Sequence, residues 1–263
     1  MKKLLKIIET LRNPVTGCPW DIDQTIQSVA PYTLEEAYEL VDAIEHKDMQ
    51  ELKLELGDLL YHVVFYAQMA KENGDFDFQE VVNAISNKLV ERHPHVFLVD
   101  ETNGKAKIEQ DLLEDAWETS KELERADKIG MEKSPILYGV AKALPALKRA
   151  QKLQKRASRE GFDWPTLEPV IGKIHEEFQE LMTAMQQNQQ AEISEEMGDL
   201  IFSCVNLARH LNVDAEEALR HCNDKFTRRF NYIEDILRVK GRTIKSCDID
   251  QLEALWCEAK DNV

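Results

Sequence analysis

Apolar residues along most of this chain recur at the spacing of an α-helix. From Ile193 onward they stand at offsets of 0, 4, 7, 8, 11, 15 and 18 residues, which fall on one stripe of a helical surface. The same period runs through residues 34–45, 51–72, 77–92, 170–185, 214–240 and 250–259. No window shows the sustained alternation of apolar and polar residues that marks a half-buried strand. The pattern therefore predicts an all-α protein.

Two acidic motifs occur twice in the same order. In each copy a Glu-x-x-Glu motif precedes a Glu-x-x-Asp motif by fifteen residues; the first copy comprises Glu36, Glu39, Glu55 and Asp58, and the second Glu177, Glu180, Glu196 and Asp199. A repeat of this kind indicates tandem structural modules. We predict one module at 1–126 and another at 134–263. The charged stretch that ends before Pro135 provides the linker, at 127–133.

The spacing within each copy predicts where the acids meet. The polar run Gln186–Gln190 separates the two motifs of the second copy, so its helices are expected to fold back as an antiparallel hairpin. Glu180 and Glu196 each lie eight residues from position 188, and Glu177 and Asp199 each lie eleven from it. Each pair is therefore level along the helix axes. In the first copy the same count centres on position 47. We predict that the four carboxylates of each copy converge on one patch.

Converging carboxylates repel one another, and a divalent cation turns that repulsion into binding. Oxygen ligands without cysteine or histidine favour Mg²⁺, or Mn²⁺ as a substitute, over zinc. The alternative is that these acids only solvate exposed helix faces. Phosphates are a further expected ligand, because protein-bound Mg²⁺ usually keeps positions open for them. No glycine-rich phosphate loop is possible, since no two glycines lie closer than Gly130 and Gly139.

Cationic and aromatic side chains near the second copy are candidate nucleotide contacts. Lys225 and Arg229 share a helix face, and Lys173 lies one turn before Glu177. Trp256 could stack on a nucleobase. The alternatives are ordinary surface cations for the first three residues and a core position for the tryptophan.

Composition and charge exclude several other classes. The 49 acidic and 33 basic residues give a net charge of −16, which argues against a general nucleic-acid-binding protein. No apolar run approaches the length of a membrane span, and the apolar run at the N-terminus is too short for a secretory signal. Five scattered cysteines without a C-x-x-C pair suit a reducing cytoplasm.

Beyond these motifs, the chain resembles the MazG nucleoside triphosphate pyrophosphohydrolases, of the all-α NTP pyrophosphatase group. The likeness runs through nearly the whole chain, including the segments at 17–21, 30–36, 55–60, 92–97 and 161–164. It implies four-helix modules, a homodimer and Mg²⁺-dependent hydrolysis of nucleoside triphosphates to monophosphate and pyrophosphate. Carried over by position, the metal ligands are Glu177, Glu180, Glu196 and Asp199, and the nucleotide contacts are Lys173, Glu176, Glu195, Lys225, Arg229 and Trp256. Glu192 departs from the family, where a basic residue can precede the second motif.

We expect catalysis in the second module, by attack of water on the α-phosphorus with Glu177 or Glu176 as general base. Lys173 and Glu195 correspond to Tyr32 and Leu54 in the first module, which lacks these charges. Glu36, Glu39, Glu55 and Asp58 are nevertheless candidate ligands for a second metal site, in the first module. Broad selectivity among NTPs and dNTPs is expected, because a helical groove offers few base-reading side chains. The alternative is a non-catalytic helical protein that binds nucleotides or regulates a partner.

Overall fold

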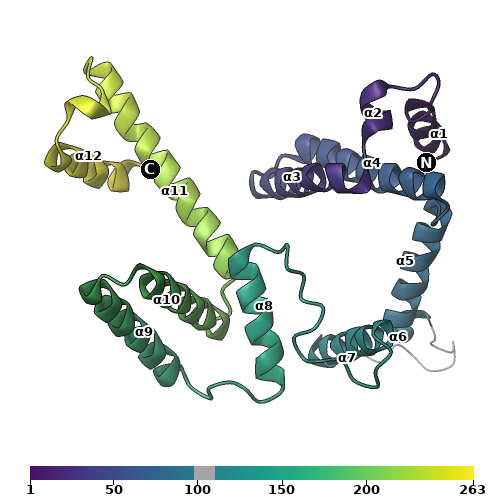
Figure 1. Cartoon of the computed structure of the whole chain (residues 1–263). Coiled ribbons are helices and arrows are strands. Elements are labelled where there is room, and N and C mark those ends of the chain that lie inside the picture. The colour runs from purple at the N-terminus through teal and green to yellow at the C-terminus, as the bar shows by residue number, and fades with distance from the viewer. Residues whose placement is uncertain (98–109) are drawn as a thin grey trace. The chain divides into compact units, whose positions relative to one another are not determined.

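The computed structural model describes residues 1–97 and 110–263, and only the backbone at 95 and 110–118. Within these ranges every regular element is a helix, which confirms the all-α prediction (Figure 1). The chain forms two compact units, Met1–Ser120 and Lys121–Val263, and each is described by itself. Helix α7 (Gln110–Lys128) runs through the boundary between these units. The module borders inferred from the sequence stay a prediction.

Unit 1 is built around a helical hairpin of α3 and α4. Its helices are α1 (Lys2–Leu11), α2 (Pro19–Asp23), α3 (Ile26–Glu45), α4 (Met49–Asn73), α5 (Phe78–Arg92) and α6 (Pro94–Phe97). Thr25 and Ser28 form a reciprocal capping box at the start of α3. Asp48 caps α4 by accepting from two backbone N–H groups. Between these helices Lys47 takes a left-handed conformation, φ 56°, at the predicted turn centre.

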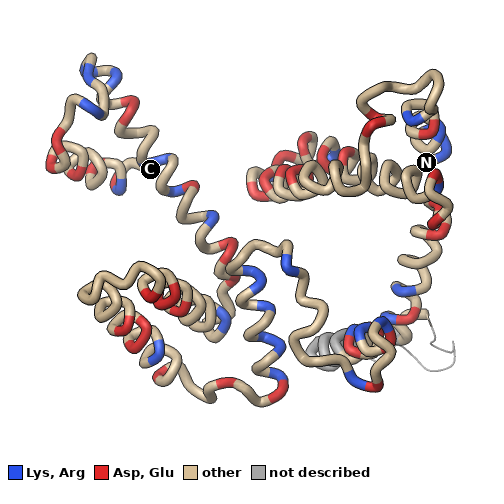
Figure 2. Tube along the Cα trace, in the orientation of Figure 1, with Lys and Arg blue, Asp and Glu red and all other residues tan. Residues whose placement is uncertain are grey.

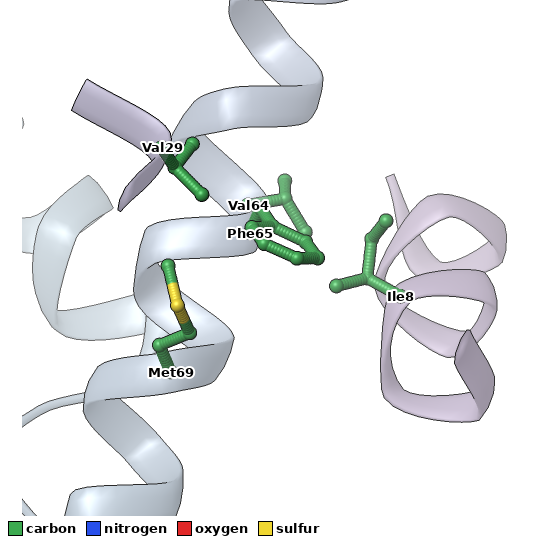
Figure 3. Close-up of a cluster of buried hydrophobic side chains, with 5 residues drawn as sticks. All are labelled: Ile8, Val29, Val64, Phe65 and Met69. Carbon is green, nitrogen blue, oxygen red and sulfur yellow. The ribbon is translucent and has the colours of Figure 1, made fainter. Parts of the chain in front are cut away.

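The core of unit 1 lies where α1 packs against α4. Figure 3 shows its buried side chains, Ile8, Val29, Val64, Phe65 and Met69. Phe65 has no exposed surface. Helix α1 was not predicted, although its Ile8 completes this core.

Unit 2 is built around the corresponding hairpin of α9 and α10. The hairpin helices are α9 (Leu167–Gln187) and α10 (Gln190–His210). The unit also contains α8 (Ala146–Arg159), α11 (Ala215–Val239), the short η1 (Ile244–Ser246) and α12 (Ile249–Asn262). Asn188 takes the left-handed conformation, φ 53°, again at the predicted turn centre. The predicted antiparallel hairpins are thus confirmed in both copies.

Helix α8 packs against α10, and α11 contacts α8 and extends away to α12 (Figure 1). Helix α9 packs chiefly against its hairpin partner α10. No helix in the described parts of the chain is long and apolar enough to cross a bilayer.

Candidate metal centre and nucleotide site

Three carboxylates meet on the second hairpin. Oxygens of Glu177 on α9 and of Glu196 and Asp199 on α10 all lie within 4.8 Å of one another, and we call these residues the α9–α10 trio. Glu177 is buried, whereas Asp199 is exposed. Glu180, the fourth predicted ligand, is outside this group. Its charge is still close enough to raise the pKa of Glu196. The structure thus brings three of the four predicted residues together.

Lys173 neutralises part of this charge. Its Nζ donates to a carboxylate oxygen of Glu176 at 2.7 Å and forms an ion pair with Glu177, also at 2.7 Å. The hydrogen bond to Glu176 contributes most to the raised pKa of Lys173, and the hydrogen bond to Glu177 contributes next. The lysine therefore stays cationic, one helical turn from the buried member of the trio.

Within the α9–α10 trio, the pKa of Glu196 is raised by its surroundings. Burial contributes most to the raised pKa of Glu196, followed by the charges of Glu180, Glu177 and Asp199. A divalent cation would relieve this repulsion. Figure 2 shows acidic residues on both hairpins and a run of Lys and Arg along α8.

The first hairpin forms a trio of different composition. Oxygens of Glu36, Glu39 and Glu55 lie within 4.8 Å of one another, and we call them the α3–α4 trio. Glu55 is 6% exposed, and its Oε2 has no hydrogen-bond partner. Burial, followed by the charges of Glu39 and Glu36, raises the pKa of Glu55 to about 7. Asp58, the fourth predicted acid, lies outside the trio.

The remaining predicted nucleotide contacts gather elsewhere in unit 2. The Arg229 guanidinium lies over the Trp256 ring, 5.7 Å from its centroid, and Phe226 packs on the same ring at 5.2 Å. Lys225 is exposed on the same helix. Glu195 is exposed on α10, beside Glu196. Among the described residues, no hydrogen bond, ion pair or ring contact joins Lys225, Arg229 or Trp256 to the α9–α10 trio.

A cavity of about 700 Å³ adjoins the α9–α10 trio. Glu177 and Asp199 border one part of it, and Gln154, Trp164 and Asn206 line another, so we call it the Asn206 cavity. Neither Gln154 nor Asn206 was predicted from the sequence as a site residue. The sequence does contain a signal for Asn206 as a site residue, because Asn206 follows Asp199 by seven residues and therefore lies on the same helix face.

The comparisons with known proteins agree with this arrangement. The model of the MazG nucleotide pyrophosphohydrolase domain matches residues 24–97 and 166–233, one match over each hairpin. The chain belongs to the MazG nucleotide pyrophosphohydrolase family.

Two similar proteins match nearly the whole chain, and a third matches part of it. The nucleoside triphosphate pyrophosphohydrolase of Escherichia coli K12 is 48% identical over 98% of this chain and 96% of its own length. The nucleoside triphosphate pyrophosphohydrolase/pyrophosphatase MazG of Thermotoga maritima is 41% identical over 98% of this chain and 95% of its own. A nucleoside triphosphate pyrophosphohydrolase of Mycobacterium tuberculosis is 32% identical over 61% of this chain and 46% of its own.

Proposed function

We propose that this chain hydrolyses nucleoside triphosphates, both NTPs and dNTPs, to nucleoside monophosphate and pyrophosphate. The observation that carries the proposal is the α9–α10 trio, whose buried Glu177 faces two acids of the other helix within 4.8 Å. The names of the relatives from Escherichia coli and Thermotoga maritima support the same activity.

Mg²⁺ is the proposed cofactor, with Mn²⁺ as a substitute. The donor set fits a hard cation, because all three side chains of the trio offer carboxylate oxygens. Burial and then the neighbouring carboxylates raise the pKa of Glu196, and a bound cation would favour its charged form. When bound, the metal supplies charge neutralisation for the triphosphate and acidifies water.

The chain's own residues hold the substrate and move the proton. Lys173 uses two of its three N–H donors on Glu176 and Glu177, so a third is available to a phosphate oxygen. Glu177 or Glu176 accepts the proton of the attacking water as it adds to the α-phosphorus. Glu177 is buried, whereas the Glu176 side chain is 57% exposed and is held by its 2.7 Å contact with Lys173. We assign Lys225 and Arg229 to the departing pyrophosphate, and Trp256 and Glu195 to further nucleotide contacts.

A homodimer completes the proposal. The α9–α10 hairpin exposes a large part of several apolar side chains, namely Phe178, Met182, Met197 and Ile201. Such contiguous exposure is typical of an interface, and a second hairpin of the same kind would convert it into a helical bundle. Light scattering should give twice the mass of the chain, whereas a monomer at micromolar concentration would contradict this.

All five cysteines are free thiols, which supports the cytoplasm as the proposed compartment.

The test measures pyrophosphate release from a panel of nucleoside triphosphates with Mg²⁺. Glu177→Gln should lower turnover by orders of magnitude, because the trio loses its buried charge. Glu36→Gln, the matching position of the first hairpin, is the control and should leave turnover within about twofold. Normal turnover of Glu177→Gln would exclude the mechanism. Nucleotide binding without any turnover would favour the alternative, a non-catalytic binding or regulatory protein.

A further inference from the structure

The Asn206 cavity has the size and lining of a site for a small organic ligand. Its volume of about 700 Å³ lies within the range of pockets that enclose such ligands. The polar side reaches Lys173, Glu177 and Asp199, while Trp164 and Phe162 border another side. Phe162 is 84% exposed and Trp164 40% exposed, so both rings are available to a ligand.

The amide of Asn206 is held in one orientation. Its Oδ1 accepts from Nε of Arg209 at 3.1 Å and from Nη2 at 2.8 Å. Because both of these groups are donors, the amide oxygen must face Arg209 and the amide N–H₂ must face away. Among the residues that the structure describes, no acceptor is assigned to that nitrogen.

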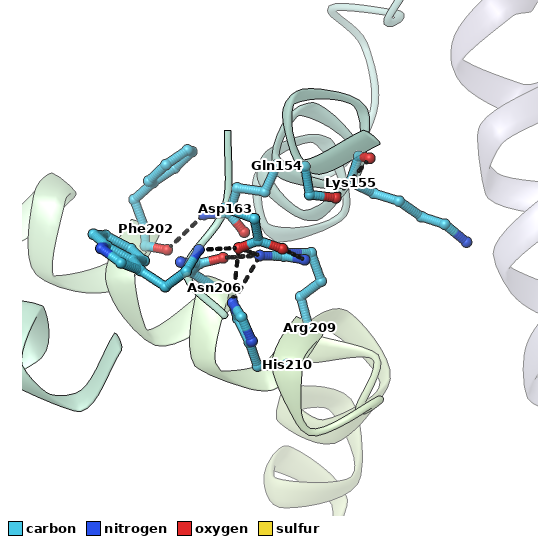
Figure 4. A network of polar contacts seen from close by, with 9 residues as sticks. Gln154, Lys155, Asp163, Phe202, Asn206, Arg209 and His210 are labelled. Atoms are coloured by element: carbon cyan, nitrogen blue, oxygen red, sulfur yellow. Dashed lines mark hydrogen bonds and ion pairs between the residues drawn. The ribbon is translucent and has the colours of Figure 1, made fainter. Parts of the chain in front are cut away.

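Arg209 is itself anchored. It donates to both oxygens of Asp163, at 2.8 and 2.5 Å, and His210 lies 2.9 Å from the same carboxylate. Asp163 also accepts from the backbone N–H of Trp164 at 3.0 Å. Figure 4 shows this network, which links the donor of Asn206 to the loop that carries Trp164. The donor is therefore preorganised.

Gln154 offers the complementary group. Its Nε2 donates to the Phe202 carbonyl at 2.9 Å, so the orientation of its amide is also determined. Gln154 is 8% exposed and lines the cavity, and its Oε1 is buried without a hydrogen-bond partner. An unpartnered buried acceptor is unfavourable until a donor reaches it.

We propose that the Asn206 cavity is a nucleobase subsite, in which the base lies against Trp164 while Asn206 donates to it and Gln154 accepts from it. This rests on the proposed function, because it places the base of the triphosphate beside the trio. A neighbouring donor and acceptor occur on the pairing edge of every common base. The subsite therefore selects for a base without selecting strongly among bases.

The first hairpin has no counterpart of this subsite. Phe65 follows Asp58 by seven residues, as Asn206 follows Asp199. Phe65 is fully buried and packs in the cluster with Ile8, so an apolar core occupies that position. The subsite is thus specific to unit 2.

The test compares substrates with and without a base. Asn206→Asp keeps the size and the Arg209 contact but removes the donor, and Asn83→Asp adds the same charge on exposed α5 as a control. We expect kcat/KM for ATP and dTTP to fall roughly tenfold to a hundredfold in Asn206→Asp. Hydrolysis of ribose 5′-triphosphate, which lacks a base, should stay within about twofold. An equal loss on both kinds of substrate, or no loss on either, would overturn the subsite.

A binding measurement separates this proposal from the proposed function. Saturation-transfer NMR with adenosine and thymidine, in EDTA, detects base contacts without any hydrolysis. The wild type and Asn83→Asp should show transfer to the base protons, and Asn206→Asp should lose most of it. Transfer in a protein that hydrolyses nothing would support the subsite and reject the pyrophosphohydrolase. Hydrolysis without transfer in the wild type, or transfer that Asn206→Asp retains, would reject the subsite alone.

Discussion

The two hairpins repeat one set of acids but bury different members of it. Of the four repeated acids in unit 1, the buried one is Glu55, on the second helix of the hairpin. In unit 2 it is Glu177, on the first helix, whereas Glu196, which matches Glu55, is only partly buried. A shared motif therefore does not determine which carboxylate is withdrawn from water.

The buried acids of the two hairpins also differ in whether a cationic side chain is paired with them. Lys173 forms an ion pair with Glu177 at 2.7 Å, and the matching residue in unit 1 is the uncharged Tyr32. Burial and the neighbouring acids Glu39 and Glu36 raise the pKa of Glu55 to about 7, so Glu55 keeps its proton below about pH 7. The second hairpin thus presents a charged site, while the first must lose a proton before a metal binds.

The largest difference between the units is expected in the free energy of unfolding when Phe65 or Asn206 is replaced. Each of these residues follows the Glu-x-x-Asp motif of its hairpin by seven residues. Phe65→Ala should lower the free energy of unfolding of unit 1 by about 3–5 kcal/mol, because it removes a fully buried ring. Asn206→Ala should cost only about 1–2 kcal/mol, because it removes two hydrogen bonds from Arg209 beside a cavity. Denaturant titration of both variants measures the two costs. Equal costs would contradict the contrast between core and cavity.

A smaller effect is expected from the cation of the second hairpin. Lys173→Ala removes a charge-assisted contact worth about 1.5–3 kcal/mol, so kcat/KM should fall roughly tenfold to a hundredfold. Tyr32→Ala, the control at the matching position, should leave the rate unchanged. Steady-state kinetics with saturating Mg²⁺ provides the comparison. Equal losses in both variants would remove the distinction between the hairpins.

The smallest effect is a pH dependence of stability in unit 1. The pKa of Glu55 is about 7 when folded and near its ordinary value when unfolded. Between those values the folded state binds more protons, so stability falls as pH rises and is lowest above about pH 7. The raised pKa of Glu39 acts in the same direction.

This dependence can be measured by thermal unfolding in EDTA at pH 5 and pH 8. Glu55→Gln should flatten the difference between the two pH values, and Glu91→Gln, on exposed α5, should not. An unchanged difference in Glu55→Gln would show that another group titrates.

The hairpins were predictable because local rules determine them. The 3.6-residue period sets the helices, and equal distances of the acids from positions 47 and 188 located the turns. Lys47 and Asn188 indeed take left-handed conformations there. Helix α8 was missed, because six of its 14 residues are cationic and its apolar stripe is narrow.

The choice of buried acid was beyond the sequence, since it depends on how distant helices cover each hairpin. Asn206 is oriented by Arg209, which is held by Asp163 from 46 residues away, and no local pattern encodes that contact. A comparison of the two sequence repeats could have identified Asn206 as a candidate site residue. Phe65 stands where Asn206 stands in the repeat, and a polar residue in place of a core aromatic is a signal of function.

The most direct test of the central claim is an anomalous difference map from crystals of this protein grown with Mn²⁺. We expect a peak bound by oxygens of Glu177, Glu196 and Asp199, with Lys173 still beside Glu177. Strong manganese density elsewhere in the molecule, with none between these three carboxylates, would contradict it.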